Sequence, residues 1–219
     1  ITNPIEGIAS VIAKYPDVIL MVDAVSSLGG IKLEVDRLGI DICISSSQKA
    51  LALPPGMSLA SISQKAEDRF NKIGERGYYL DLKTMLRFID QKDHQYHCTP
   101  SLPHMFALDF QLDRILKEGL ENRFIRHIEI GEYTINWASH FFKTFAAPGF
   151  ESMTITCIEN TRKINISQLN SSLAEKGMVI SNGYGDLKDK TFRIAHMGEL
   201  TIDDMIEVTG AIEEILKLT

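Results

Sequence analysis

Three short apolar runs, each bounded by polar or turn-forming residues, constrain the fold of this chain most strongly. They cover residues 18–22, 40–44 and 57–62. Continuous apolar runs of this length are typical of strands buried on both faces of a sheet. Apolar residues also recur at helical spacing before the first run and after the third, over 5–13 and 66–73. The alternation predicts an α/β protein with a layered sheet.

The second half of the chain mixes helices with short strands. It predicts long helices over 102–117 and 120–145, an alternating strand over 153–158, a helix over 166–176, strands over 178–181 and 191–195, and a last helix. Gly119 is a suitable C-cap between the two long helices, and Thr201 opens a capping box before the last one. We therefore expect a large sheet domain over 1–118 and a smaller α+β domain over 119–219.

Composition narrows the class of protein. The 219 residues are 44% hydrophobic and 24% charged, which argues against a disordered or collagen-like chain. The net charge of −6 disfavours nucleic acid as a partner. No apolar run approaches the roughly 20 residues that span a bilayer, and no targeting signal opens the chain. Three scattered cysteines (Cys43, Cys98 and Cys157) suit a reducing compartment, so we expect a soluble, cytoplasmic protein without a membrane partner.

Chemically active residues follow the first two predicted strands. Asp23 comes directly after the first, and Ser45 to Lys49 follow the second. Open α/β sheets bind ligands outside the carboxyl ends of their strands, so these residues are candidates for a site. Spacing alone does not distinguish a functional site at Asp23 and Lys49 from a structural salt bridge or two solvated charges.

Six stretches, in order along nearly the whole chain, favour a functional site over these structural explanations. They are VDAVSSLGG (22–30), DRLGIDICISSSQKALALPPG (36–56), YYLDLK (78–83), YHCTPS (96–101), EGLENR (118–123) and FRIAHMG (192–198). With them the chain resembles the class V, fold-type I aminotransferases that depend on pyridoxal phosphate, and most of all the alanine–glyoxylate and serine–pyruvate type. The resemblance implies part of the large cofactor-binding domain, a mixed sheet with flanking helices, followed by a smaller C-terminal α+β domain.

The resemblance also implies residue roles. Lys49 stands where the family has the lysine that forms a Schiff base with the cofactor and then moves a proton. Asp23 stands where a carboxylate favours the protonated pyridine nitrogen that makes the ring an electron sink. Val25 would lie against one face of the ring, and Gln48 would bind the phosphate.

Further matches concern a partner subunit and the substrate. Tyr96 and Thr99 match residues that reach the phosphate in the partner's site, which implies a homodimer with isologous contacts. Arg193 matches the arginine that grips the substrate carboxylate through two parallel hydrogen bonds. The implied reaction moves an amino group from a small L-amino acid, alanine or serine, to a 2-oxo acid, glyoxylate or pyruvate, by a ping-pong mechanism.

Part of the family's cofactor pocket has no match here. The phosphate-cradling turn and the aromatic residue that stacks on the ring precede the first match in the family, and the chain starts at Ile1 without an initiating Met. Gly183-Tyr184-Gly185 does not fill the gap, because it lacks the third glycine of a dinucleotide fingerprint. We therefore expect a C-terminal portion of an aminotransferase, with a non-catalytic fragment as the alternative.

Other chemistries have weaker support. Ser58, in Gly56-Met57-Ser58-Leu59-Ala60, approaches a hydrolase nucleophile elbow, but it lacks the last glycine and precedes a strand. His94, His97 and Cys98 could ligate zinc but lack a fourth ligand, so we expect no metal. Within the cofactor family, a phosphonate transaminase, a lyase or a desulfurase are alternatives, although Cys43 lies in a predicted buried strand where a thiol is inert.

Overall fold

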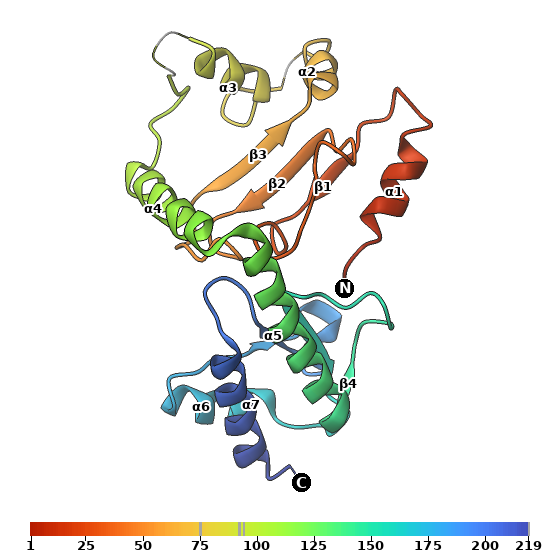
Figure 1. Ribbon diagram of the computed structural model, residues 1–219, viewed down its shortest axis with the longest axis vertical. Coiled ribbons are helices and arrows are strands. Elements are labelled where there is room, and N and C mark those ends of the chain that lie inside the picture. Colours follow the sequence, from red (N-terminus) through yellow and green to blue (C-terminus); the bar gives the residue numbers. More distant parts are fainter. Residues whose placement is uncertain (75, 92, 94, 219) are drawn as a thin grey trace.

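The first half of the chain builds a small mixed sheet. The computed structural model describes residues 1–219 except 75, 92, 94 and 219. Strands β1 (Met21–Asp23), β2 (Ile42–Ser46) and β3 (Ser58–Ile62) form a sheet in the order β1-β2-β3. β1 and β2 run parallel, whereas β2 and β3 run antiparallel (Figure 1). The expected α/β fold with a mixed sheet is confirmed.

Helix α1 (Ile5–Ile12) flanks this sheet (Figure 1). It and the first two strands share one apolar cluster, whose buried members are Ala9, Leu20, Val22, Ala24, Ile40 and Cys43. The helical and strand periodicities therefore meet in one core, which holds the carboxyl ends of β1 and β2 beside each other.

Both parallel strands begin later than their apolar runs predict. β1 pairs with β2 alone within the described sheet, and only Val22 of its three residues is buried. The prediction of a strand buried on both faces was therefore wrong for β1. β2 extends to Ser46, because Ser45 and Ser46 pair with Leu59 and Ser58 of β3. Pairing across the sheet extends this strand into residues that looked like a turn.

Four helices connect the two halves: α2 (Gln64–Phe70), α3 (Leu82–Ile89), α4 (Leu102–Glu118) and α5 (Leu120–Phe141). Gly119 separates α4 from α5 with φ of +86°, a value that glycine adopts readily, as predicted. α5 ends at Phe141 rather than at residue 145, because Phe142 leaves helical geometry and a strand follows. α3 was not predicted; Asp81 caps it by accepting the Thr84 backbone N–H at 3.2 Å.

The second half builds an antiparallel sheet. Strands β4 (Lys143–Thr144), β5 (Ile155–Glu159), β6 (Ser181–Asn182) and β7 (Thr191–Ala195) lie in the order β4-β5-β7-β6. Helices α6 (Ile166–Glu175) and α7 (Ile202–Leu216) and the short 3₁₀ helix η1 (Gly185–Leu187) complete this half. The predicted capping box is present, with Thr201 and Asp204 bonding each other's backbone.

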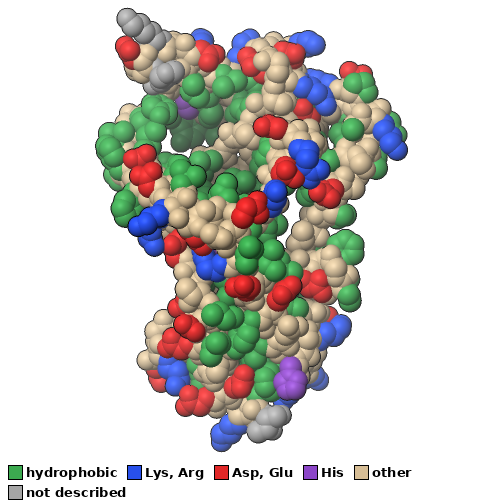
Figure 2. Space-filling view, viewed as in Figure 1, with side chains coloured by type: hydrophobic (Ala, Val, Ile, Leu, Met, Phe, Trp, Pro, Cys, Tyr) green, Lys and Arg blue, Asp and Glu red, His purple; other side chains and the backbone are tan. Residues whose placement is uncertain are grey.

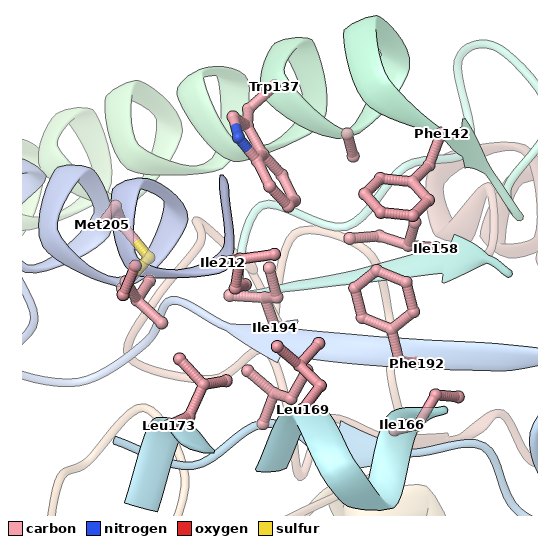
Figure 3. Close-up of a cluster of buried hydrophobic side chains, with 14 of the residues drawn as sticks. Trp137, Phe142, Ile158, Ile166, Leu169, Leu173, Phe192, Ile194, Met205 and Ile212 are labelled. Carbon is pink, nitrogen blue, oxygen red and sulfur yellow. The ribbon is translucent and has the colours of Figure 1, made fainter. Parts of the chain in front are cut away.

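A single apolar core holds these elements together. In Figure 3, side chains of α5, α6 and α7 and of strands β5 and β7 point toward one another. The rings of Phe142 and Phe192 meet edge to face at 5.2 Å between centroids. Burying a side chain such as Phe192, which is 0% exposed, stabilises the fold by about 1.5–3 kcal/mol.

The two sheets lie in opposite parts of an elongated molecule, and α5 runs from the middle into the second part (Figure 1). This arrangement accords with the division at 118/119, which stays a prediction. Among the helices of the described residues, none is long and apolar enough to cross a membrane.

Candidate active site

One cavity lies between the two sheets and collects residues from both. Its volume is about 670 Å³. Asp23 and Val25 line it from the end of β1, Lys49 from the loop after β2, and Arg193 from β7. Four of the residues singled out in the sequence therefore meet in one place, although they span 170 positions of the chain.

Asp23 is fixed by its own turn. It is the last residue of β1, and its Oδ1 accepts the backbone N–H of Val25 at 2.9 Å. The next residue, Ala24, donates its N–H to the Ile44 carbonyl of β2 at 2.8 Å, which continues the ladder past the strand end. Held in this way, Asp23 lines the cavity, and Val25 contributes an apolar side chain to the same wall.

Lys49 lies in a tightly folded loop. Ser47 is fully buried, and its Oγ donates to the Pro54 carbonyl at 2.7 Å while its own carbonyl accepts the N–H of Leu53 at 3.0 Å. The Lys49 carbonyl accepts the N–H of Ala52, whose φ is +56°. The backbone around the lysine is thus closed by short-range hydrogen bonds, and its half-buried side chain faces the cavity.

Arg193 is held on the opposite wall. It lies on β7 opposite Cys157 of β5 and Ser181 of β6. Its Nε and Nη2 donate to the Asn182 carbonyl at 3.2 and 3.0 Å, and its Cζ lies 4.0 Å from the centroid of the Tyr184 ring. Both positive groups, Lys49 and Arg193, therefore face one space together with a carboxylate.

The structure does not bring every predicted residue to this cavity. Gln48, Tyr96 and Thr99 are exposed and stand outside its lining. Their roles toward the phosphate, and across a subunit interface for Tyr96 and Thr99, stay predictions.

The residues of the alternative chemistries can also be placed. Ser58 is the first residue of β3, so no helix follows it as an elbow requires. His94 lies outside the described residues. Nε2 of His97 lies 2.8 Å from the Tyr79 carbonyl. Among the residues that the structure describes, no group of three or more His, Cys, Asp or Glu could hold a metal ion. Cys43 is buried in β2, and burial, followed by the charge of Asp23, raises the pKa of its thiol.

Sequence reasoning missed Arg123, which is fully buried against the loops that follow β1 and β2. Its Nε donates to the Gly29 carbonyl and its Nη2 to the Ala50 carbonyl, both at 2.8 Å. Its Nη1 binds Glu118 at 2.7 Å and Glu199 at 3.1 Å. One side chain thus joins the loops after β1 and β2 to the α4–α5 junction and to the loop after β7. Its presence in EGLENR was the available signal.

The two carboxylates of this Arg123 cluster are held ionised. Burial opposes ionisation of Glu118, but hydrogen bonds from Arg126 and Arg123 outweigh it and lower its pKa below the ordinary value. Burial likewise opposes ionisation of Glu199, and Arg123 and Gln111 lower its pKa by hydrogen bonding to it. The cluster is therefore a fully ionised, partly buried network at neutral pH.

Comparison with known proteins identifies the family. Residues 1–185 match the family model described as aminotransferase class-V, so the chain belongs to the class V aminotransferase family. An uncharacterized aminotransferase of Methanocaldococcus jannaschii is 36% identical over 218 residues, which are 98% of this chain and 56% of that protein. An alanine–glyoxylate aminotransferase of Callithrix jacchus is 31% identical over 225 residues, covering 99% of this chain and 54% of its own length.

Solved structures agree. The crystal structure of alanine–glyoxylate aminotransferase from Nostoc sp. superposes with a TM-score of 0.88 and 26% identity, over 97% of this chain and 57% of that chain. The present chain thus spans a little over half the length of the curated relatives it matches.

The cofactor of this family is pyridoxal phosphate, and the residues of the cavity fit it. The cofactor needs an amine for its aldehyde, an acid near its ring nitrogen and an apolar surface for its ring. Lys49, Asp23 and Val25 supply these three groups on one cavity. The chemical groups on the cavity wall therefore match the needs of the family's cofactor.

Proposed function

We propose that this chain forms part of an aminotransferase that moves an amino group from a small L-amino acid, alanine or serine, to a 2-oxo acid, glyoxylate or pyruvate. Two half-reactions of a ping-pong cycle share the cavity between the two sheets. The observation that carries the proposal is the convergence of Lys49, Asp23 and Arg193 on that cavity. The names of the relatives support the choice of small substrates.

Bound pyridoxal phosphate would supply an aldehyde and an electron-withdrawing ring. The Nζ of Lys49 would hold the cofactor through its aldehyde. The same amine would act as the general base and acid that moves the proton of the substrate Cα. Asp23 would keep the ring nitrogen protonated, Val25 would support the ring, and Gln48 would bind the phosphate.

Arg193 would bind the substrate carboxylate. A guanidinium donates two parallel hydrogen bonds to a carboxylate, which fixes the direction of the Cα as well as its distance. Since the Asn182 carbonyl already occupies Nε, the arginine is oriented before the substrate arrives.

The active unit is proposed to be a homodimer, with Tyr96 and Thr99 reaching the partner's site. Hydrophobic side chains gather on the upper part of the molecule around α4 (Figure 2), where Phe106, Phe110 and Leu116 are each at least 66% exposed. Covering these side chains would remove a large apolar surface from water. Analytical ultracentrifugation of the wild type and of Phe110→Asp tests this: the wild type should sediment as a dimer and the variant as a monomer.

The decisive test is cofactor binding at Lys49. Adding pyridoxal phosphate to the protein should produce a yellow absorbance band that is lost in Lys49→Ala. Lys143→Ala is the matched control, because Lys143 is exposed and pairs with Glu159. A band of equal size in Lys49→Ala would refute the assignment. A wild type that binds no cofactor would favour the non-catalytic alternative.

Substrate assignment needs a second measurement. A panel of amino donors and 2-oxo acceptors should show the highest kcat/KM for alanine or serine with glyoxylate or pyruvate. Arg193→Ala should raise the KM of both substrates and leave the yellow band unchanged; loss of the band instead would contradict the role given to Arg193. A cytoplasmic location is also proposed, and the three free cysteines support it.

A further inference from the structure

The segment Gly183-Tyr184-Gly185 presents an aromatic ring at the cavity. It connects β6 to η1, and Tyr184 lines the cavity next to Arg193. Gly183 is buried, and a Cβ there would lie 2.1 Å from the Leu187 carbonyl oxygen. The N–H of Gly183 donates to the Thr191 carbonyl at 2.9 Å, which ties the segment to β7. The backbone that carries Tyr184 is therefore closely packed, although its side chain is 77% exposed.

The contacts of Arg193 with Asn182 and Tyr184 do not involve the end-on edge of its guanidinium. Asn182 accepts from Nε and from Nη2, and the Tyr184 ring covers one face with 4.0 Å between Cζ and the ring centroid. Neither contact uses Nη1. The edge formed by Nη1 and the second N–H of Nη2 is the edge that a carboxylate meets end-on with two hydrogen bonds. The ring and the Asn182 carbonyl together restrict how the guanidinium can turn.

We infer that Tyr184 is a positioning residue that holds the Arg193 guanidinium in the orientation that receives a substrate carboxylate. This inference rests on the proposed function, because it gives Tyr184 a task only if Arg193 binds a carboxylate. The face of the Tyr184 ring holds the guanidinium through the attraction between a cation and a π-system. Phenylalanine at this position would keep the contact, because it keeps the ring.

Electrostatics agree with this geometry. Arg193, by hydrogen bonding and by its charge, lowers the pKa of the Tyr184 phenol below its ordinary value of 10.0, and the charge of Lys49 adds a smaller effect. Both cations of the cavity therefore act on this side chain. A titration of Tyr184 reports on the contact without any cofactor: Arg193→Leu should move the phenol's pKa back toward its ordinary value.

The main test compares Tyr184→Phe with Tyr184→Leu in the enzyme loaded with pyridoxal phosphate. Propionate, which has a carboxylate but no amine, is titrated by calorimetry, and KM and kcat are measured with pyruvate. An exposed cation–π contact implies that Tyr184→Leu weakens propionate binding and raises the KM for pyruvate by about two- to fivefold. kcat should stay within about twofold, and Tyr184→Phe should resemble the wild type. Tyr15→Leu, at a tyrosine that is 56% exposed outside the cavity, is the control.

Three outcomes separate the inference from the proposed function. If Arg193→Lys weakens propionate binding and Tyr184→Leu does not, the inference is overturned and the proposed function stands. If Arg193→Lys has no effect, the role of Arg193 fails and the inference fails with it. If Tyr184→Leu loses its effect when it is combined with Arg193→Lys, the two residues act through one contact, as inferred.

Discussion

Replacing Arg123 by methionine should be among the most destabilising single changes in this protein. The substitution keeps most of the side-chain volume and removes the guanidinium, which is 0% exposed. It deletes the hydrogen bonds to the Gly29 and Ala50 carbonyls and both ion pairs, to Glu118 and Glu199. The effect is therefore that of breaking a buried ionic network by removing one partner.

The magnitude follows from what remains. Each carbonyl left without a donor costs about 1–3 kcal/mol when water cannot reach it. Glu118 and Glu199 are partly exposed and keep Arg126 and Arg114 as partners, so they lose less than fully buried charges would. The free energy of unfolding should fall by about 3–5 kcal/mol, against a total of about 5–15 kcal/mol for a typical protein.

Urea unfolding measures this loss directly. The midpoint should fall with little change in the slope of free energy against urea, because the surface exposed on unfolding stays similar. Arg37→Met is the matched control, since Arg37 binds Glu6 and Glu34 with its side chain 55% exposed. Exposed ion pairs contribute little to stability, so the control should change the midpoint little.

Acid provides a second measure of the Arg123 cluster. The lowered pKa values of Glu118 and Glu199 mean that their contribution is complete above the ordinary value of 4.5 and is lost as the pH falls through the lowered values. The difference between the wild type and Arg123→Met should therefore shrink below pH 4.5. At neutral pH, a loss of stability for Arg123→Met no larger than that for Arg37→Met would refute the reasoning.

Other changes test other parts of the fold. Burial lowers the pKa of His196 to about 4, so the folded ring stays neutral while the unfolded ring gains a proton below its ordinary pKa of 6.5. The free energy of unfolding should fall by about 1.4 kcal/mol for each pH unit as the pH drops from 6.5 toward 4. In His196→Gln the difference between the urea midpoints at pH 7 and pH 5 should be smaller than in the wild type. In Gly30→Ala the new Cβ would lie 2.7 Å from Thr154, so thermal unfolding should reveal a loss of about 1–3 kcal/mol. Thr201→Ala removes the capping box shared with Asp204 and should lower the free energy of unfolding by about 1 kcal/mol in the same assay. An unchanged thermal midpoint would argue against a stabilising cap.

Local patterns predicted most of the helices and strands. The spacing of apolar residues located α1, α4 and α6 within one or two residues, and β7 was predicted at its observed limits. Capping chemistry placed the start of α7, and Gly119 the break between α4 and α5. These features depend on neighbours close in sequence, so a single sequence contains the information that specifies them.

Features that depend on distant partners could not be predicted in this way. The extension of β2 over Ser45 and Ser46 comes from pairing with β3. The convergence of Lys49 with Arg193 requires two sheets to face one cavity, which no spacing encodes; only the family resemblance selected Arg193. The role of Arg123 depends on carbonyl partners 73 and 94 residues away, which no local pattern contains.

The cavity is lined by residues of two separate sheets. Asp23 ends β1 and Lys49 follows β2, and these two strands pair in the first sheet, whereas Arg193 belongs to the second sheet. A tilt of one sheet against the other would change the distance between the Lys49 amine and the Arg193 guanidinium. It would leave the distance between Asp23 and Lys49 unchanged. If Lys49 and Arg193 act as proposed, the separation of the two sheets sets the length of the substrate that fits between them.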